Sequence, residues 1–141
     1  MSATAAEYNA QVIDEFRGNE GRVGGIWDGT PLLLLHHTGA RSGASRVNPV
    51  GYLADESRCV IFASNGGAPS NPAWYHNLKA KPNTRIEVGR ETIDVLAREA
   101  TGEERQRQFR RGAERFPDLA EHARRTDRDI PVIVLTPLGG A

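Results

Sequence analysis

The chain is poor in cysteine and carries no excess charge of either sign. Its 141 residues include one cysteine, so an intrachain disulfide and a cysteine-rich zinc site are excluded. Basic and acidic residues number 18 each, so the net charge gives no general attraction to nucleic acid. No apolar run approaches the ~20 residues of a membrane span, and the N-terminus lacks a signal-peptide pattern. These features predict a cytoplasmic protein.

Several catalytic motifs are also missing. His36 and His37 are adjacent, so on a strand they would point to opposite faces, and no H-E-x-x-H motif is present. We therefore expect no metal site. The chain has no G-x-S-x-G elbow, no Walker loop and no Rossmann fingerprint. Cys59 lies within an apolar run and is predicted to be a structural thiol.

The length is that of one domain, and apolar periodicity divides it into short elements. We expect an N-terminal helix within residues 1–18 and one domain over residues 19–138. The predicted strands are Pro31–His37, Ala44–Ala54, Arg58–Ser64, Thr84–Val88, Thr92–Ala97 and Ile130–Leu135. The first three suggest an antiparallel meander, and Pro131 argues for an edge or end position. About six strands with interspersed helices predict an α+β fold, a small β-barrel with helices packed around it.

Three further helices are predicted from capping signals. Residues 73–80 follow Pro72, which suits a first helical position, with Ser70 or Asn71 as the cap. Thr101 and Glu104 have capping-box spacing at the start of a helix over residues 103–115. A short helix follows Pro117.

A polar turn between two predicted strands is the first candidate site. Residues 38–49 contain two glycines, three hydroxyl side chains and the guanidinium groups of Arg41 and Arg46. Such a turn can direct backbone N–H groups, hydroxyls and guanidinium groups at one anion, most plausibly a phosphate. The alternative is a solvated hairpin turn.

A second segment, residues 64–78, has the features of a ligand wall. Gly66 and Gly67 follow a predicted strand and allow a planar ligand to approach the backbone. The following helix begins with a positive end that favours negative charge, and Trp74 offers a flat apolar surface. The alternative is that Trp74 and Leu78, four residues apart, belong to the core.

In their order along the chain, several segments resemble the deazaflavin-dependent nitroreductase family. These segments are Phe16–Gly25, Leu32–Pro49, Ala63–Pro69, Asn71–Leu78 and Asp127–Val132, and the resemblance spans about residues 9–138. It implies a split β-barrel of the FMN-binding type that takes a hydride from reduced coenzyme F420 and passes it to an acceptor such as a quinone, an activated alkene or a nitro compound.

The resemblance also implies a set of site residues. The turn holds the cofactor's phosphate and acidic tail, and the second segment lines the deazaflavin ring. From their own chemistry, Ser64 and His122 are the expected catalytic residues: Ser64 would hydrogen-bond the ring or the acceptor oxygen, and His122 or water would return a proton. The expected cofactor contacts are Thr38, Gly39, Arg41, Ser42, Gly43, Arg46, Asn48, Pro49, Ala63, Ser64, Asn65, Gly66, Gly67, Pro72, Trp74 and Asn77.

The chain departs from the family pattern near the acceptor. Phe116, Leu119 and His122 stand where family nitroreductases tend to place tyrosines, and Asn65 replaces a lysine. Cofactor binding is expected to be intact, whereas activation of nitroimidazole prodrugs stays open, with His122 a substitute for one of the tyrosines.

Three alternatives stay open at this point. FMN could replace F420 in the same fold, or the chain could be a non-catalytic binder of an apolar ligand such as a fatty acid. The amphipathic N-terminal helix either packs on the barrel, covers the site or rests on a membrane surface to reach quinones.

Overall fold

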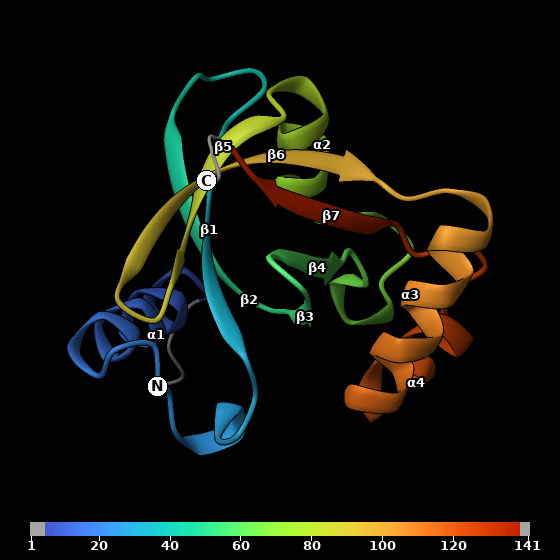
Figure 1. Ribbon diagram of the computed structural model, residues 1–141, viewed down its shortest axis with the longest axis horizontal. Coiled ribbons are helices and arrows are strands. Elements are labelled where there is room, and N and C mark those ends of the chain that lie inside the picture. Colours follow the sequence, from blue (N-terminus) through green and yellow to red (C-terminus); the bar gives the residue numbers. More distant parts are fainter. Residues whose placement is uncertain (1–4, 139–141) are drawn as a thin grey trace.

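The computed structural model describes residues 5–138 as a curled antiparallel sheet with helices around it (Figure 1). The strands are β1 (Leu32–Thr38), β2 (Ser45–Gly51), β3 (Leu53–Asp55), β4 (Arg58–Phe62), β5 (Asn83–Val88), β6 (Glu91–Glu99) and β7 (Val132–Pro137). The helices are α1 (Ala5–Gly18), α2 (Ala73–Ala80), α3 (Gly102–Arg115) and α4 (Pro117–Arg125), with short 3-10 turns η1 (Gly25–Trp27) and η2 (Asn65–Gly67).

The strand order shows why the sheet curls. The order is β2-β1-β5-β6-β7-β4-β3, so β2 and β3 form its two edges. Only Tyr52 separates these two strands in the chain. Because one residue spans at most ~3.6 Å, the two edges must approach each other, which closes the sheet into a split barrel.

The apolar run Leu32–Leu35 is buried on both faces of β1. Leu33 and Leu35 point into the barrel core, whereas Leu32 and Leu34 contact Val12 and Phe16 of α1. Since side chains alternate along a strand, a run without polar residues fits a strand covered on both sides. The helix α2 adds Trp74, Tyr75 and Leu78 to the barrel core.

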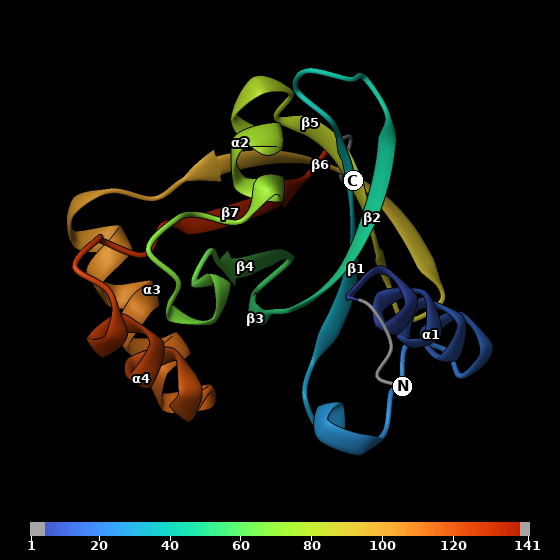
Figure 2. The same ribbon diagram turned by 180° about the vertical axis from the view of Figure 1, so that it is seen from behind.

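The helices lie on different sides of the sheet. In Figures 1 and 2, α1 and the α3–α4 pair occupy opposite ends of the molecule. On the outer face of β4 and β7, Val60, Val132 and Val134 form a cluster against which Phe109 of α3 packs. The turn between β1 and β2 lies beside α2, where Ala40 N–H donates to Asn77 Oδ1 at 3.0 Å.

The predicted three-strand meander is wrong. The expected strand Ala44–Ala54 is broken at Tyr52, whose N–H donates to the Pro31 carbonyl, and its halves lie at opposite edges of the sheet. Pro131 immediately precedes β7, so its predicted position at a strand end is correct. β7 is an internal strand between β6 and β4, so the predicted position on a sheet edge is wrong. Periodicity cannot reveal this pairing because it reports only on local burial.

The predicted helix caps are also wrong in detail. Pro72 is itself the cap of α2, and Asn71 Oδ1 accepts a bond from Arg128 instead. Thr101 is the cap residue of α3 but makes no side-chain capping bond. The Glu104 carboxylate receives two bonds from Arg98, at 2.7 and 2.9 Å, and this charge-assisted pair replaces the expected capping box.

The helix α1 packs on the barrel. Val12 and Phe16 are buried, and Arg17 donates to Glu87 of β5, where it lowers the pKa of that carboxyl group.

Within residues 5–138, no helix is long and apolar enough to cross a membrane. Burial raises the pKa of Cys59 to about 11, so its thiol is protonated at neutral pH.

Candidate active site

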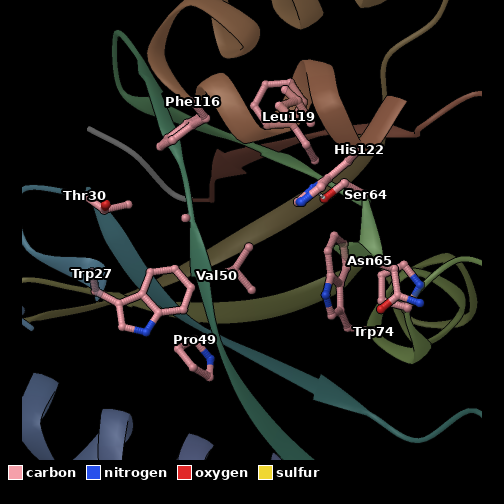
Figure 3. Close-up of a pocket in the computed structure, with 13 residues that line it drawn as sticks. Trp27, Thr30, Pro49, Val50, Ser64, Asn65, Trp74, Phe116, Leu119 and His122 are labelled. Carbon is pink, nitrogen blue, oxygen red and sulfur yellow. Dashed lines mark hydrogen bonds between the residues drawn. The ribbon is translucent and has the colours of Figure 1, made fainter. Parts of the chain in front are cut away.

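Two adjoining hollows lie between β2, the β4–α2 loop and the helices. We call the first the ring pocket; it has a volume of about 440 Å³ (Figure 3). It is lined by Trp27, Thr30, Pro49, Val50, Gly51, Phe62, Ser64, Asn65, Pro72, Trp74, Phe116, Leu119 and His122. We call the second the anion cleft; its volume is about 890 Å³. It is lined by His37, Gly39, Ala40, Arg41, Ser42, Arg46, Asn48, Ala73, His76 and Asn77.

The turn at the edge of the anion cleft is held by its own backbone. Gly39 N–H donates to the Ala44 carbonyl, and Gly43 N–H donates back to the Gly39 carbonyl, both at 2.9 Å. A side chain at Gly39 would place its Cβ 2.5 Å from Ser42 Oγ. Any larger residue there would have to displace the Ser42 hydroxyl, which accepts a bond from Ala44 N–H.

A buried histidine links this turn to α2. Asn77 Oδ1 already accepts from Ala40 N–H, so its amide nitrogen faces His37 Nδ1, 2.9 Å away, and that ring nitrogen accepts. His37 Nε2 then donates to Asn48 Oδ1 at 2.7 Å. Burial lowers the pKa of His37, and the nearby Arg46 lowers it further. A neutral imidazole thus fixes the turn, β2 and α2 relative to one another.

The anion cleft is electropositive. Arg41 and Arg46 line it and are exposed, and their guanidinium groups have no ion-pair or hydrogen-bond partner among residues 5–138. None of the described lining residues is acidic. Ala73 places the first turn of α2, with its positive end, at the same hollow. These groups suit a phosphate or carboxylate ligand.

The ring pocket has apolar walls and one polar corner. Figure 3 shows Trp27 and Trp74 on opposite sides, with Pro49 and Val50 of β2 between them. At the polar corner, Ser64 Oγ lies 3.1 Å from His122 Nδ1 of α4. Both residues are partly buried. The pocket can therefore enclose a flat apolar molecule, and it presents the Ser64 hydroxyl and the His122 imidazole to one end of that molecule.

The two hollows share the same two segments. On β2, Asn48 lines the anion cleft and Pro49 the ring pocket; at the start of α2, Ala73 lines the cleft and Pro72 the pocket. One ligand with an anionic tail and a planar ring can therefore occupy both. This donor set fits a deazaflavin nucleotide, whose phosphate would lie at the arginines and whose ring would lie near Trp74.

A single arginine holds the loop that forms the pocket wall. We call residues 63–72 the ring loop. Arg128 Nε donates to the Ala68 carbonyl at 3.1 Å, and Nη2 to the carbonyls of Ala63 and Ser64 at 3.3 and 2.9 Å. Nη1 donates to Asn71 Oδ1. The fork geometry of guanidinium matches four acceptors that a lysine could not reach together.

Replacing Arg128 with lysine should loosen the ring loop while leaving the barrel folded. Hydrogen bonds from a charged group contribute about 1.5–3 kcal/mol each, so cofactor affinity should fall by at least roughly tenfold. Hydrogen exchange at the amides of residues 65–70 should accelerate. Arg124→Lys is the matched control, because Arg124 pairs only with Glu121 on the surface of α4. Equal exchange in both variants would contradict this role.

The predicted site residues fall into three groups. Gly39, Arg41, Ser42, Arg46, Asn48 and Asn77 line the anion cleft. Pro49, Ser64, Asn65, Pro72, Trp74 and His122 line the ring pocket. Outside both hollows lie Thr38, Gly43, Ala63 and Gly67, and the surroundings of the predicted Gly66 lie outside what the structure describes.

Some of these outer residues have structural surroundings of their own. Ala63 is fully buried in the barrel core. Gly67 has a φ of +84°, and a Cβ there would lie 3.0 Å from Arg125 Cβ and 3.1 Å from the His122 carbonyl. The close approach at this glycine is therefore made by α4. Trp74 belongs to the core and also lines the ring pocket, and its contact with a ligand stays a prediction.

Sequence reasoning missed several lining residues. His37 and His76 line the anion cleft, and Trp27, Thr30 and Phe62 line the ring pocket. Trp27 carried a signal, since it is an isolated tryptophan in a glycine-rich segment with no apolar periodicity. Phe62 carried none, because it continues the apolar run of β4.

The fold and the two hollows define a split-barrel protein with a basic cleft beside an apolar pocket, an arrangement that fits a ligand with an anionic tail and a planar ring. Residues 9–137 match the model of a family described as F420H(2)-dependent quinone reductase. The chain is 38% identical over 128 residues to an F420H(2)-dependent quinone reductase of Mycobacterium tuberculosis, covering 86% of this chain and 84% of that protein.

Two further relatives agree. A putative F420H(2)-dependent quinone reductase of the same organism is 37% identical over 107 residues, covering 76% of this chain and 90% of the relative. A solved structure described as an F420-H2 dependent reductase superposes with a TM-score of 0.69 at 38% identity, covering 74% of this chain and 93% of that one.

The chain belongs to the F420H(2)-dependent quinone reductase family. It is an oxidoreductase of split-barrel fold whose cofactor is coenzyme F420, which confirms the predicted fold class, enzyme class and cofactor. The FMN alternative and the non-catalytic binder gain no support from these relatives. Another similar structure, 31% identical with a TM-score of 0.71 and covering 94% of this chain and 99% of that one, is described as a domain-swapped dimer.

Proposed function

We propose that this protein reduces quinones with F420H2, with the cofactor tail in the anion cleft and the quinone in the ring pocket. The observation that carries the proposal is the contact between Ser64 Oγ and His122 Nδ1, at 3.1 Å, inside an apolar pocket that adjoins two unpaired arginines. When bound, reduced F420 supplies a hydride from its deazaflavin ring.

The chain's own residues bind and orient the two reactants. Arg41 and Arg46 hold the phosphate and acidic tail by charge-assisted bonds, while Trp74 forms the wall beside the ring. Trp27, Phe116 and Leu119 provide apolar surface for the acceptor and keep water away from it. Positioning of this kind is the protein's main contribution when a cofactor carries the chemistry.

The polar corner completes the reaction. Reduction of a quinone to a hydroquinone needs two electrons and two hydrogens: the hydride carries both electrons and one hydrogen, and the other hydrogen arrives as a proton. Ser64 Oγ–H donates to the quinone oxygen on which negative charge develops, and protonated His122 Nδ1 donates to Ser64 Oγ. The proton passes from Ser64 to the quinone oxygen and is replaced from His122.

The proposal places the reaction in the cytoplasm rather than at a membrane surface. The residues of α1 that would enter a bilayer, Val12 and Phe16, are buried against β1.

Anaerobic turnover with reduced F420 and a quinone such as menadione tests the proposal. The expected result is saturable, enzyme-dependent formation of oxidised F420, with no rate when NADPH replaces F420H2. The same assay with a nitroimidazole should give little or no turnover, because Phe116 and Leu119 supply no phenol. Saturable F420 binding without quinone turnover would exclude the acceptor assignment alone.

A further inference from the structure

A glycine in the interior of α3 lies against a wall of the ring pocket. Gly112 is buried in this helix, between Gln108 one turn before and the helix end at Arg115. Glycine is unfavourable in a helix interior relative to alanine, so a steric reason for it is expected. The φ of Gly112 is not in the left-handed region, which leaves space as the reason.

The neighbour that needs this space is Phe62 of β4. A Cβ built on Gly112 would lie 2.3 Å from Phe62 Cζ, 2.8 Å from Cε2 and 2.9 Å from Cε1. The whole tip of the ring therefore rests on the helix backbone. Phe109, one turn earlier on α3, contacts the same ring edge-on with centroids 6.3 Å apart.

Phe62 also lines the ring pocket, together with Phe116 and Leu119. Its ring is enclosed by α3 and the valine cluster of β4 and β7, and the open volume beside it is the pocket. Because packed interiors do not yield easily, a methyl group at Gly112 would displace the ring toward that volume.

We propose that Gly112 is a specificity-determining residue: by letting Phe62 sit back against α3, it sets the depth of the ring pocket and so admits two-ring quinones. This inference rests on the proposed function, since it assumes that the acceptor occupies the ring pocket. Gly112 acts through Phe62 and touches neither reactant, so it is a positioning residue.

Direct quinone binding to the cofactor-free protein tests the inference. The chain has two tryptophans, Trp27 and Trp74, and both line the ring pocket, so quenching of tryptophan fluorescence reports on its occupancy. The probes are duroquinone, with one ring, and 2,3-dimethyl-1,4-naphthoquinone, with two. Both are fully substituted at the quinone ring and cannot add to the Cys59 thiol.

Gly112→Ala should raise the Kd for the two-ring quinone at least fivefold and change that for duroquinone less than twofold. Phe62→Leu combined with Gly112→Ala should restore two-ring binding to within twofold of wild type. Gly18→Ala is the matched control, because a Cβ there meets nothing within 4 Å. In turnover, the two-ring KM should rise in Gly112→Ala with kcat changed less than twofold.

The outcomes separate the inference from the proposed function. If wild-type protein binds neither quinone, the acceptor site itself is wrong and the inference fails with it. If wild type binds both and Gly112→Ala is unchanged, or is weakened equally for both, the inference alone is overturned. Should Gly112→Ala not fold, a folded double variant with wild-type two-ring affinity would support it, and an unfolded double variant would overturn it.

Discussion

Replacing Arg41 or Arg46 with alanine is expected to weaken binding of oxidised F420 by roughly 10- to 150-fold each, because a charge-assisted hydrogen bond contributes about 1.5–3 kcal/mol. Both side chains line the anion cleft without a partner among residues 5–138, so neither removal breaks an existing ion pair. The loss should therefore appear in ligand affinity while the melting temperature stays near that of wild type. Fluorescence quenching of F420 measures it.

Two controls sharpen this experiment. Arg107→Ala removes the same charge from the exposed surface of α3, outside both hollows, and should leave affinity within twofold. Arg46→Lys keeps a point charge but loses the guanidinium fork, so it should recover only part of the affinity. Unchanged affinity in both alanine variants would refute the phosphate position assigned to the turn.

Loss of the Ser64–His122 pair is expected to reduce kcat for menadione by about 100-fold, the low end for general acid catalysis because water can substitute in part. His122→Gln keeps a hydrogen-bonding group beside Ser64 but cannot release a proton at neutral pH. Ser64→Ala removes the hydroxyl that passes the proton on. F420 affinity should change less than twofold in His122→Gln, since this residue lines the ring pocket, outside the anion cleft, at its proposed acceptor end.

The two substitutions should not add. If Ser64 and His122 form one relay, the double variant should be no slower than the slower single variant, as expected for residues that act as a unit. Additive losses would show that the 3.1 Å contact is structural rather than catalytic.

The local elements were largely predictable because their signals are local. Residues 73–80 form a helix as expected, and the run Leu32–Leu35 is a strand. Thr101 and Glu104 show the limit of such signals: the spacing of a capping box is present, but Arg98 takes the carboxylate. A neighbour on the preceding strand can outcompete a partner within the helix when it offers a stronger, charge-assisted bond.

By itself the sequence determined most element types, the absence of an intrachain disulfide, and the cationic character of the turn, because backbone preference and side-chain charge belong to each residue. Tertiary structure alone decided that Tyr52 joins opposite edges of the sheet, that His122 meets Ser64 across 58 residues, and that Arg128 holds the ring loop. It also decided that Gly112 lies against Phe62. Such contacts depend on how the sheet closes, and closure is set by pairing and packing over the whole barrel rather than by any local pattern.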